Sequence, residues 1–177
     1  SFKESDKSFD ISCDGLDIKP ENNLIFKSLN AITKYCKVDK GIQIHLKKII
    51  PAGAGLGGGS SNAATTLIAL NKIWGLNLPT EELANIGKGL GADVPIFIYG
   101  KNAVAKGIGD VLSDIEFKKN KYLLISPDIE VSTSEMFGKL KIHELDPNHQ
   151  NSFLGTLLKE HKSFEECYEI LVSLKIR

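Results

Sequence analysis

Residues 51–62 read PAGAGLGGGSSN and place five glycines within seven positions, directly before two serines. Glycine tolerates positive φ and puts no side chain between the backbone and a ligand, so successive amide groups of such a loop converge on one anion. The spacing of Ala63, Leu67, Leu70 and Trp74 predicts a helix from about Ser61, whose unpaired amides and dipole favour negative charge. A strand before the loop and a helix after it disfavour a flexible linker. The segment is predicted to be a phosphate-binding loop.

Two common types of phosphate loop fit this segment poorly. A Walker loop has the form Gly-x4-Gly-Lys-Ser/Thr, and Gly59 stands where the lysine belongs. Gly53, Gly55 and Gly58 match the dinucleotide pattern GxGxxG, which calls for an acidic residue about 20 positions later. Residues 65–80 contain no acidic residue. A Rossmann oxidoreductase is therefore a remote alternative, which NADH binding would test.

The flanking sequence predicts a mixed α+β domain rather than a regular βαβ alternation. Apolar spacing predicts helices over residues 22–37 and from Thr80, as N-cap, to about Leu90. Strands are predicted within 8–15 and over 42–46, 96–99, 103–106 and 122–126, with a glycine turn at 107–109 and helices and loops from Ser132 onward. The lysine-rich FKKNK places a domain boundary near residues 112–120.

Composition narrows the function classes. Lys plus Arg and Asp plus Glu are 22 each, so net charge favours neither nucleic acid nor an anionic membrane. No apolar run reaches the roughly 20 residues of a membrane span. The three cysteines, Cys13, Cys36 and Cys167, are predicted to be free thiols. The chain begins without Met and starts and ends within predicted structure, so we expect a fragment.

Asp93 is the candidate catalytic residue, within GADVPIF at residues 91–97. The sequence places it between the end of a helix and a strand, next to Pro95. In phosphoryl transfer, an aspartate near the acceptor hydroxyl orients it or accepts its proton. The structural alternative is an aspartate that caps a turn. The nearby phosphate loop favours the catalytic role.

The two segments together resemble the GHMP kinase superfamily. PAGAGLGGGSSNAA at 51–64, GADVPIFIYGKNAVAKGIGD at 91–110 and PENNLIFKSL at 20–29 are similar to the subfamily that acts on 4-diphosphocytidyl-2-C-methyl-D-erythritol. The resemblance implies a GHMP kinase fold. It assigns residues 1–113 to an N-terminal ATP-binding domain, a two-layer α/β structure like that of ribosomal proteins, and residues 114–177 to part of a C-terminal ferredoxin-like domain.

The resemblance also implies an activity, a location and a set of site residues. ATP, with Mg2+, would phosphorylate the 2-hydroxyl of cytidine diphosphate methylerythritol in the non-mevalonate isoprenoid pathway, in the bacterial cytoplasm or plastid stroma. The protein would be a monomer or weak homodimer. Asp93 would be catalytic, and Ser61 would contact the metal. Phe137, Thr133 and Asn62 would bind substrate, with Phe137 stacking on cytosine. The implied ATP-binding residues are Pro51, Ala52, Gly53, Ala54, Gly55, Leu56, Gly57, Gly58, Gly59, Ser60, Ser61, Asn23 and Lys48.

Several features of the family are absent from these residues. They are an AKxN-like segment with the catalytic lysine, a Gly-Tyr-His region that holds cytidine, and a late glycine-rich motif. Asp110 also stands where the subfamily usually has glutamate. We therefore expect this chain alone to be nearly inactive. A non-catalytic nucleotide-binding module and another GHMP small-molecule kinase remain alternatives. For single residues, a solvated Lys48, a core Phe137 and an Asn62 that only begins a helix remain open.

Overall fold

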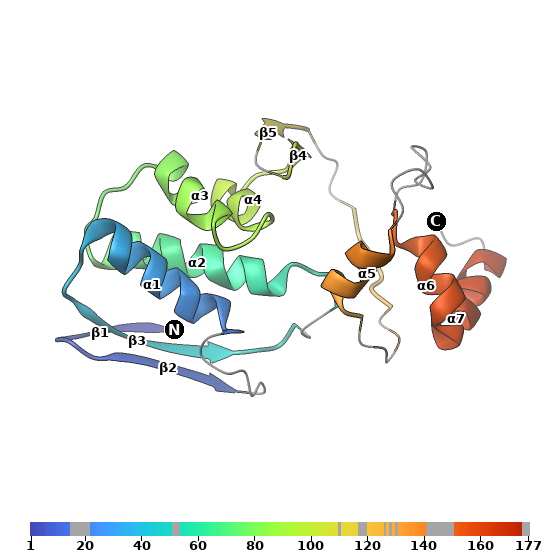
Figure 1. Cartoon of the computed structure of the whole chain (residues 1–177), viewed down its shortest axis with the longest axis horizontal. Helices are drawn as coiled ribbons and strands as arrows, with labels where there is room; N and C mark the ends of the chain where they lie inside the picture. The colour runs from blue at the N-terminus through green and yellow to red at the C-terminus, as the bar shows by residue number, and fades with distance from the viewer. Residues whose placement is uncertain are drawn as a thin grey trace. The chain divides into compact units, whose positions relative to one another are not determined.

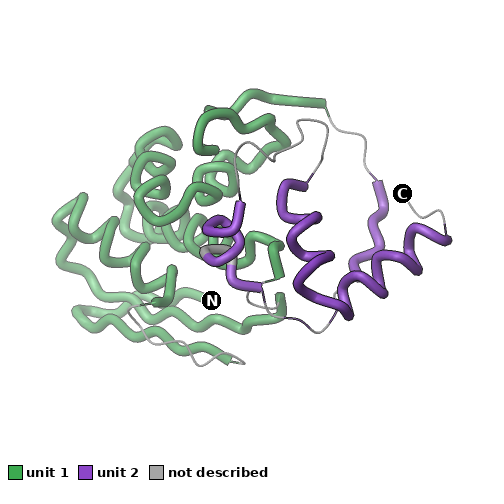
Figure 2. The backbone as a smooth tube through the Cα atoms, turned by 45° about the vertical axis from the view of Figure 1, so that its right-hand side comes forward, with its two compact units in different colours: residues 1–119 green, residues 120–177 purple. Residues whose placement is uncertain are grey.

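The computed structural model describes residues 1–14, 22–50, 54–109, 111–116, 120–125, 127, 129, 131–140 and 151–174. The chain divides into two compact units, Ser1–Lys119 and Asn120–Arg177 (Figure 2). Unit 1 contains the glycine-rich loop and Asp93, and unit 2 contains Phe137. None of the helices in the described ranges is both long and apolar enough to cross a membrane.

A three-stranded sheet forms one layer of unit 1, in the order β1-β3-β2. β1 (Phe2–Ser5) is antiparallel to β3 (Gly41–Lys47), and β2 (Phe9–Asp14) is parallel to it. Burial alternates along β3, where Ile42 and Ile44 are buried and Gln43 is exposed. One face of the sheet therefore belongs to the core, as the period of two requires.

Two helices cover this face (Figure 1). α1 (Leu24–Cys36) connects the parallel strands β2 and β3, and α2 (Gly58–Ile73) follows the glycine-rich loop. The shared core contains Ile25, Leu29, Ile32, Ile42, Ile44, Ala63, Ala64, Leu67, Leu70 and Trp74. The helix over 22–37, the strand over 42–46 and the helix after the loop are confirmed. α2 begins at Gly58 rather than near Ser61, because Gly57 adopts a left-handed φ of 65° and starts the helix earlier.

α3 (Thr80–Lys88) and α4 (Val94–Tyr99) pack against each other and against α2. A Cβ on Gly87 would lie 2.8 Å from side-chain atoms of Ile98 and Val94, so this close approach needs glycine. A hairpin follows, formed by β4 (Ala103–Lys106) and β5 (Val111–Asp114). β4 and the glycine turn at 107–109 are confirmed, whereas β1 and β5 were not predicted.

Three predictions about local structure are wrong. Residues 96–99 belong to α4, not to a strand, because Pro95 suits the first turn of a helix and Gly100 ends it with a φ of 70°. Thr80 is not the N-cap of α3, since Pro79 holds that position and no side chain caps the helix. Residues 122–125 form no strand, and Ser126 lies outside the described residues.

The described part of unit 2 contains three helices: α5 (Thr133–Lys139), α6 (Leu154–Glu160) and α7 (Lys162–Ser173). Met136 is buried, and the ring of Phe137 meets that of Phe153 edge to face, with centroids 5.0 Å apart. Lys139 Nζ lies 2.6 Å from Glu160 Oε2. Helices after Ser132 are confirmed. The assignment of this unit to a ferredoxin-like domain stays a prediction.

Candidate active site

The N-terminus of α2 has unpaired backbone donors. Its N-cap, Gly57, has no side chain to offer, and the first helical bond runs from the Ser61 amide to the Gly57 carbonyl oxygen at 2.8 Å. The amides of Gly58, Gly59 and Ser60 therefore have no acceptor within the helix. Sixteen residues of helix direct their dipole toward this end. Three amides are available to an anion here, while that of Ser61 is already engaged. Pro51, Ala52 and Gly53 lie outside the described residues.

The glycines of the loop are required for packing as well as for backbone conformation. A Cβ on Gly57 would lie 2.7 Å from the ring of Phe97, and one on Gly58 would lie 2.8 Å from Lys48 Nζ. Gly59 is similarly close to Leu24, at 3.2 Å. Side chains from α1, from α4 and from the segment after β3 thus lie close to the start of α2. These contacts distinguish the loop from a flexible linker, which would have no such neighbours.

Lys48 follows β3 and is half-buried. Its Nζ lies beside the backbone of Gly58, and within the described ranges no carboxylate comes within ion-pair distance of it. A half-buried, uncompensated ammonium beside free helix amides favours a bound anion. The solvated-lysine interpretation fits this placement less well.

Asp93 is the N-cap residue of α4, but its carboxylate does not cap that helix. It lies between α3 and α4, which corrects the expectation that a strand follows it. The side chain is exposed and makes no hydrogen bond to any described residue. The turn-capping alternative is therefore not what the structure shows. Within the described residues the carboxylate is therefore unengaged, and it directly precedes the helix whose Phe97 contacts Gly57.

The two asparagines differ in their local contacts. Asn23 is the N-cap of α1, where its Oδ1 accepts from the Ile25 amide at 2.9 Å. Its Nδ2 makes no hydrogen bond to a described residue. Asn62 is half-buried in the first turn of α2, and its side chain makes no hydrogen bond within the described part of the chain. Both stay predicted ligand contacts.

Oxygen donors for a metal ion are few in this region. Ser60 and Ser61 are half-buried on the first turn of α2, with hydroxyls that bond to no described residue. Among the described residues, no group of three His, Cys, Asp or Glu side chains could hold a metal ion. A cation here would take most of its ligands from bound phosphates, as Mg2+ commonly does.

Phe137 and Thr133, the predicted cytosine-binding residues, both belong to α5 in unit 2. Phe137 is 63% exposed, and its buried neighbour is Met136. The aromatic ring is therefore largely exposed, and it also packs edge to face on Phe153 within this unit. Its part in substrate binding stays a prediction.

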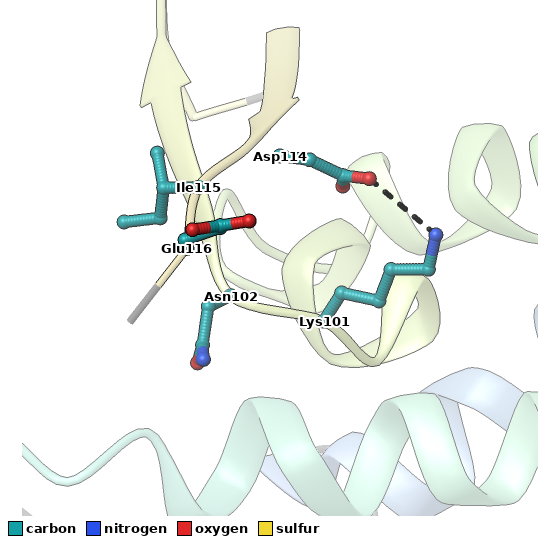
Figure 3. Close-up of a pocket in the computed structure, with 5 residues that line it drawn as sticks. All are labelled: Lys101, Asn102, Asp114, Ile115 and Glu116. Atoms are coloured by element: carbon teal, nitrogen blue, oxygen red, sulfur yellow. Dashed lines mark hydrogen bonds and ion pairs between the residues drawn. The ribbon is translucent and has the colours of Figure 1, made fainter. Parts of the chain in front are cut away.

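An open pocket of about 570 Å³ lies at the base of the hairpin and contains none of the predicted site residues (Figure 3). It is lined by Lys101, Asn102, Asp114, Ile115 and Glu116. The Tyr99 hydroxyl donates to Asp114 Oδ1, and Lys101 Nζ lies 3.5 Å from Asp114 Oδ2. The Tyr99 hydrogen bond first, and then Lys101, lowers the pKa of Asp114. This cluster fastens the C-terminal end of α4 to β5.

A layered α+β fold with an uncapped helix start after a glycine-rich loop is an arrangement that suits phosphate binding. The family described as "GHMP kinases N terminal domain" matches residues 23–101. Over these residues the chain thus matches the N-terminal domain of the GHMP kinases. Two crystal structures share the fold: a 4-(cytidine 5'-diphospho)-2C-methyl-D-erythritol kinase and a homoserine kinase from Cytophaga hutchinsonii. The first has a TM-score of 0.77 at 23% identity and covers 100% of this chain and 70% of the other. The second has a TM-score of 0.60 at 22% identity and covers 80% and 50%.

The sequence relatives share a single enzyme name, which is more specific than the shared fold. Proteins from Shewanella piezotolerans, Acinetobacter baylyi and Haemophilus influenzae, each named 4-diphosphocytidyl-2-C-methyl-D-erythritol kinase, are 42%, 50% and 42% identical to this chain. The matches cover 87%, 67% and 98% of this chain but 53%, 43% and 54% of the relatives. The chain thus spans about half the length of the curated relatives it matches.

Proposed function

We propose that the protein phosphorylates the 2-hydroxyl of 4-diphosphocytidyl-2-C-methyl-D-erythritol with ATP, in the non-mevalonate route to isoprenoid precursors. The observation that carries the proposal is the uncapped start of α2, beside which Lys48 lies. In the same unit Asp93 directly precedes α4, and its carboxylate does not cap that helix. Relatives at 42–50% identity that have this name supply the substrate.

The proposed chemistry is direct in-line transfer. The amides of Gly58, Gly59 and Ser60 hold phosphate oxygens, and Lys48 adds positive charge beside Gly58. Asp93 orients the substrate hydroxyl or accepts its proton as the bond to phosphorus forms. The Ser61 hydroxyl is the protein ligand offered to Mg2+, which when bound neutralises charge on the phosphates. Preorganised charge of this kind is a leading source of rate acceleration in such sites.

The remaining assignments belong to the same proposal. Residues 1–113 form the ATP-binding domain, and residues 114–177 begin a second domain. Phe137 and Thr133 of the second domain and Asn62 of α2 contact substrate. Asn23 contributes to the nucleotide site. The protein acts as a monomer or weak homodimer in the bacterial cytoplasm or plastid stroma, on a small molecule and not on nucleic acid or membranes.

A substrate-dependent ADP-release assay on the complete natural polypeptide tests the proposal. The cytidine diphosphate substrate should stimulate ADP release, and phosphorus NMR should detect a new phosphate monoester. Asp93→Asn should lower kcat about 100-fold or more, the usual effect of losing a catalytic acid–base group, with little change in ATP affinity.

Asp10→Asn is the matched control, because Asp10 is another exposed aspartate of unit 1 without a hydrogen-bonding partner in the described structure. It should leave turnover unchanged. ATP binding without substrate-dependent ADP release would favour the non-catalytic module. Release with mevalonate or homoserine, but not with the cytidine diphosphate substrate, would favour another GHMP kinase.

A further inference from the structure

Phe97 contacts the phosphate loop from α4. Its ring atoms Cζ and Cε2 would lie 2.7 and 2.9 Å from a Cβ placed on Gly57. Gly57 has a φ of 65° and is the residue from which α2 begins. Phe97 is 36% exposed, so part of the ring packs against this backbone and part faces outward.

The same helix begins with Asp93. Phe97 is four residues after Asp93, about one helical turn, so the carboxylate and the ring lie near one another along α4. The ring therefore connects two groups that belong to different segments of the chain. One is the loop whose amides are proposed to hold the phosphates, and the other is the carboxylate that is proposed to face the acceptor hydroxyl.

α4 is itself held at several points. Val94 and Ile98 are buried against Gly87 of α3. At the C-terminal end, Tyr99 donates a hydrogen bond to Asp114 of β5. At the other end, a Cβ on Gly109 in the hairpin turn would lie 3.2 Å from the Ala92 carbonyl oxygen. A helix fixed in this way is a firm support for the Gly57 contact.

We propose that Phe97 is a positioning residue that sets the separation between the phosphate loop and Asp93. This inference rests on the proposed kinase function. Gly55 and Gly57 both adopt positive φ, and glycine backbones have access to many other conformations. The ring limits those alternatives at Gly57. A displacement of about 1 Å between reacting groups costs up to about 100-fold in rate, so a loosened loop would bind ATP yet transfer phosphate slowly.

The test is a graded series at Phe97 in the complete natural polypeptide, assayed with ATP and the cytidine diphosphate substrate. Phe97→Tyr keeps the ring and should retain kcat. Phe97→Leu should lower kcat partly, and Phe97→Ala should lower it about 10-fold or more while the KM for ATP changes less than about threefold. A residue that only stabilises the fold would lower the melting temperature without this split between kcat and KM.

Phe9→Ala is the control, since Phe9 is a comparably exposed phenylalanine of unit 1, at 47%, on β2 away from the loop contact. It should leave kcat unchanged. Equal losses in Phe9→Ala and Phe97→Ala, or a wild-type kcat in Phe97→Ala, would overturn the inference. A wild-type protein that neither binds ATP nor turns over would instead overturn the proposed function.

A double-mutant cycle with Gly57→Ala isolates the contact. Gly57→Ala alone combines backbone strain with a clash against the Phe97 ring, whereas in the Phe97→Ala background only the strain remains. Its effect on kcat/KM should therefore be smaller there, by about fivefold or more, since groups in contact are non-additive. Additive effects would contradict a coupling through this contact, even if Phe97→Ala folded poorly.

Discussion

The two long helices of unit 1 begin in opposite ways, although they lie against each other and share one core (Figure 1). At α1, the side chain of Asn23 accepts a hydrogen bond from the Ile25 amide. At α2, the N-cap is Gly57, which has no side chain, and no other side chain caps the helix. Loss of a capping side chain commonly costs about 1 kcal/mol of stability. The start of α1 is thus completed by its own side chain, while that of α2 has no side-chain cap, as the proposed anion site requires.

α4 repeats the contrast within one short helix. Its N-cap residue, Asp93, has a side chain that is able to cap but does not. Its C-terminal end is closed by the Gly100 amide, which donates to the Ile96 carbonyl oxygen, and by the Tyr99–Asp114 hydrogen bond. The starts of α2 and α4 coincide with residues that the family resemblance assigns to chemistry, whereas α3, which also lacks a side-chain cap, begins after Pro79 and has no assigned role.

The strongest test of this contrast is a side chain at the open start of α2. Gly58→Val should weaken ATP binding at least about 10-fold, because its Cβ would meet Lys48 Nζ and Ile50 Cγ2 at 2.8 and 3.3 Å and displace the lysine from the amides. Titration of the chain with ATP, followed by fluorescence or calorimetry, measures the loss. Gly138→Ala in α5, where a Cβ meets nothing within 4 Å, is the control and should bind ATP normally. Wild-type affinity in Gly58→Val would place the phosphates elsewhere.

The sequence predicted the open start because both of its signals are local. Glycine clustering shows that the backbone must come close to something, and the apolar period from Ala63 to Leu70 shows that a helix follows. Packing partners are not local signals. Nothing in the sequence indicates that Phe97 lies on Gly57 or that Lys48 lies beside Gly58, since these contacts depend on how α4 and β3 pack.

The mistaken strand at 96–99 has a physical reason of the same kind. IFIY is a short run of β-branched and aromatic residues, which periodicity alone does not assign to strand or helix. Burial of Val94 and Ile98 against Gly87 of α3 favours the helix. The same ambiguity explains the strand wrongly predicted from Tyr122, where the side chains at 122–125 are exposed and form no ladder.

Substitutions of Asn23 test the capped start of α1, the other side of the comparison with α2, and their expected effect is smaller. Asn23→Ala removes the cap of α1 and should lower the free energy of unfolding by about 1 kcal/mol, as measured by urea denaturation. Asn23→Asp keeps a capping oxygen but removes the Nδ2 donor, so it should preserve stability.

The pair separates the two roles of this residue. If Asn23 also contacts the nucleotide, both variants should weaken ATP binding, while only Asn23→Ala loses stability. If ATP affinity is unchanged in both, Asn23 is a cap alone and the predicted nucleotide contact is wrong.

The smallest expected effect is at the closed end of α4. Tyr99→Phe removes the hydrogen bond to Asp114. In the wild type this hydrogen bond lowers the pKa of Asp114 from its ordinary 3.8 and raises the pKa of Tyr99 from 10.0. Because the folded-state pKa of Asp114 is lowered, the hydrogen bond stabilises the fold fully above pH 3.8. This contribution is lost as the pH falls through the lower folded-state pKa. Because the folded-state pKa of Tyr99 is raised, the stabilisation is complete below pH 10.0 and is lost as the pH rises through the higher folded-state value. The melting temperature of Tyr99→Phe should therefore lie slightly below wild type near neutral pH, since the pair is exposed and solvent screens it.

That gap should close in strong acid and again in strong base, and thermal melts across pH measure it. Tyr168→Phe, a tyrosine of α7 without a hydrogen bond in the described structure, should show no gap at any pH. A gap for Tyr99→Phe that persisted in strong acid would mean that the ring, not the hydroxyl, holds α4 to β5.

ATP affinity should stay unchanged in Tyr99→Phe, because this end of α4 is closed by the chain itself. A weakened affinity would show that the open and closed ends of α4 are coupled, and would remove the separation between them.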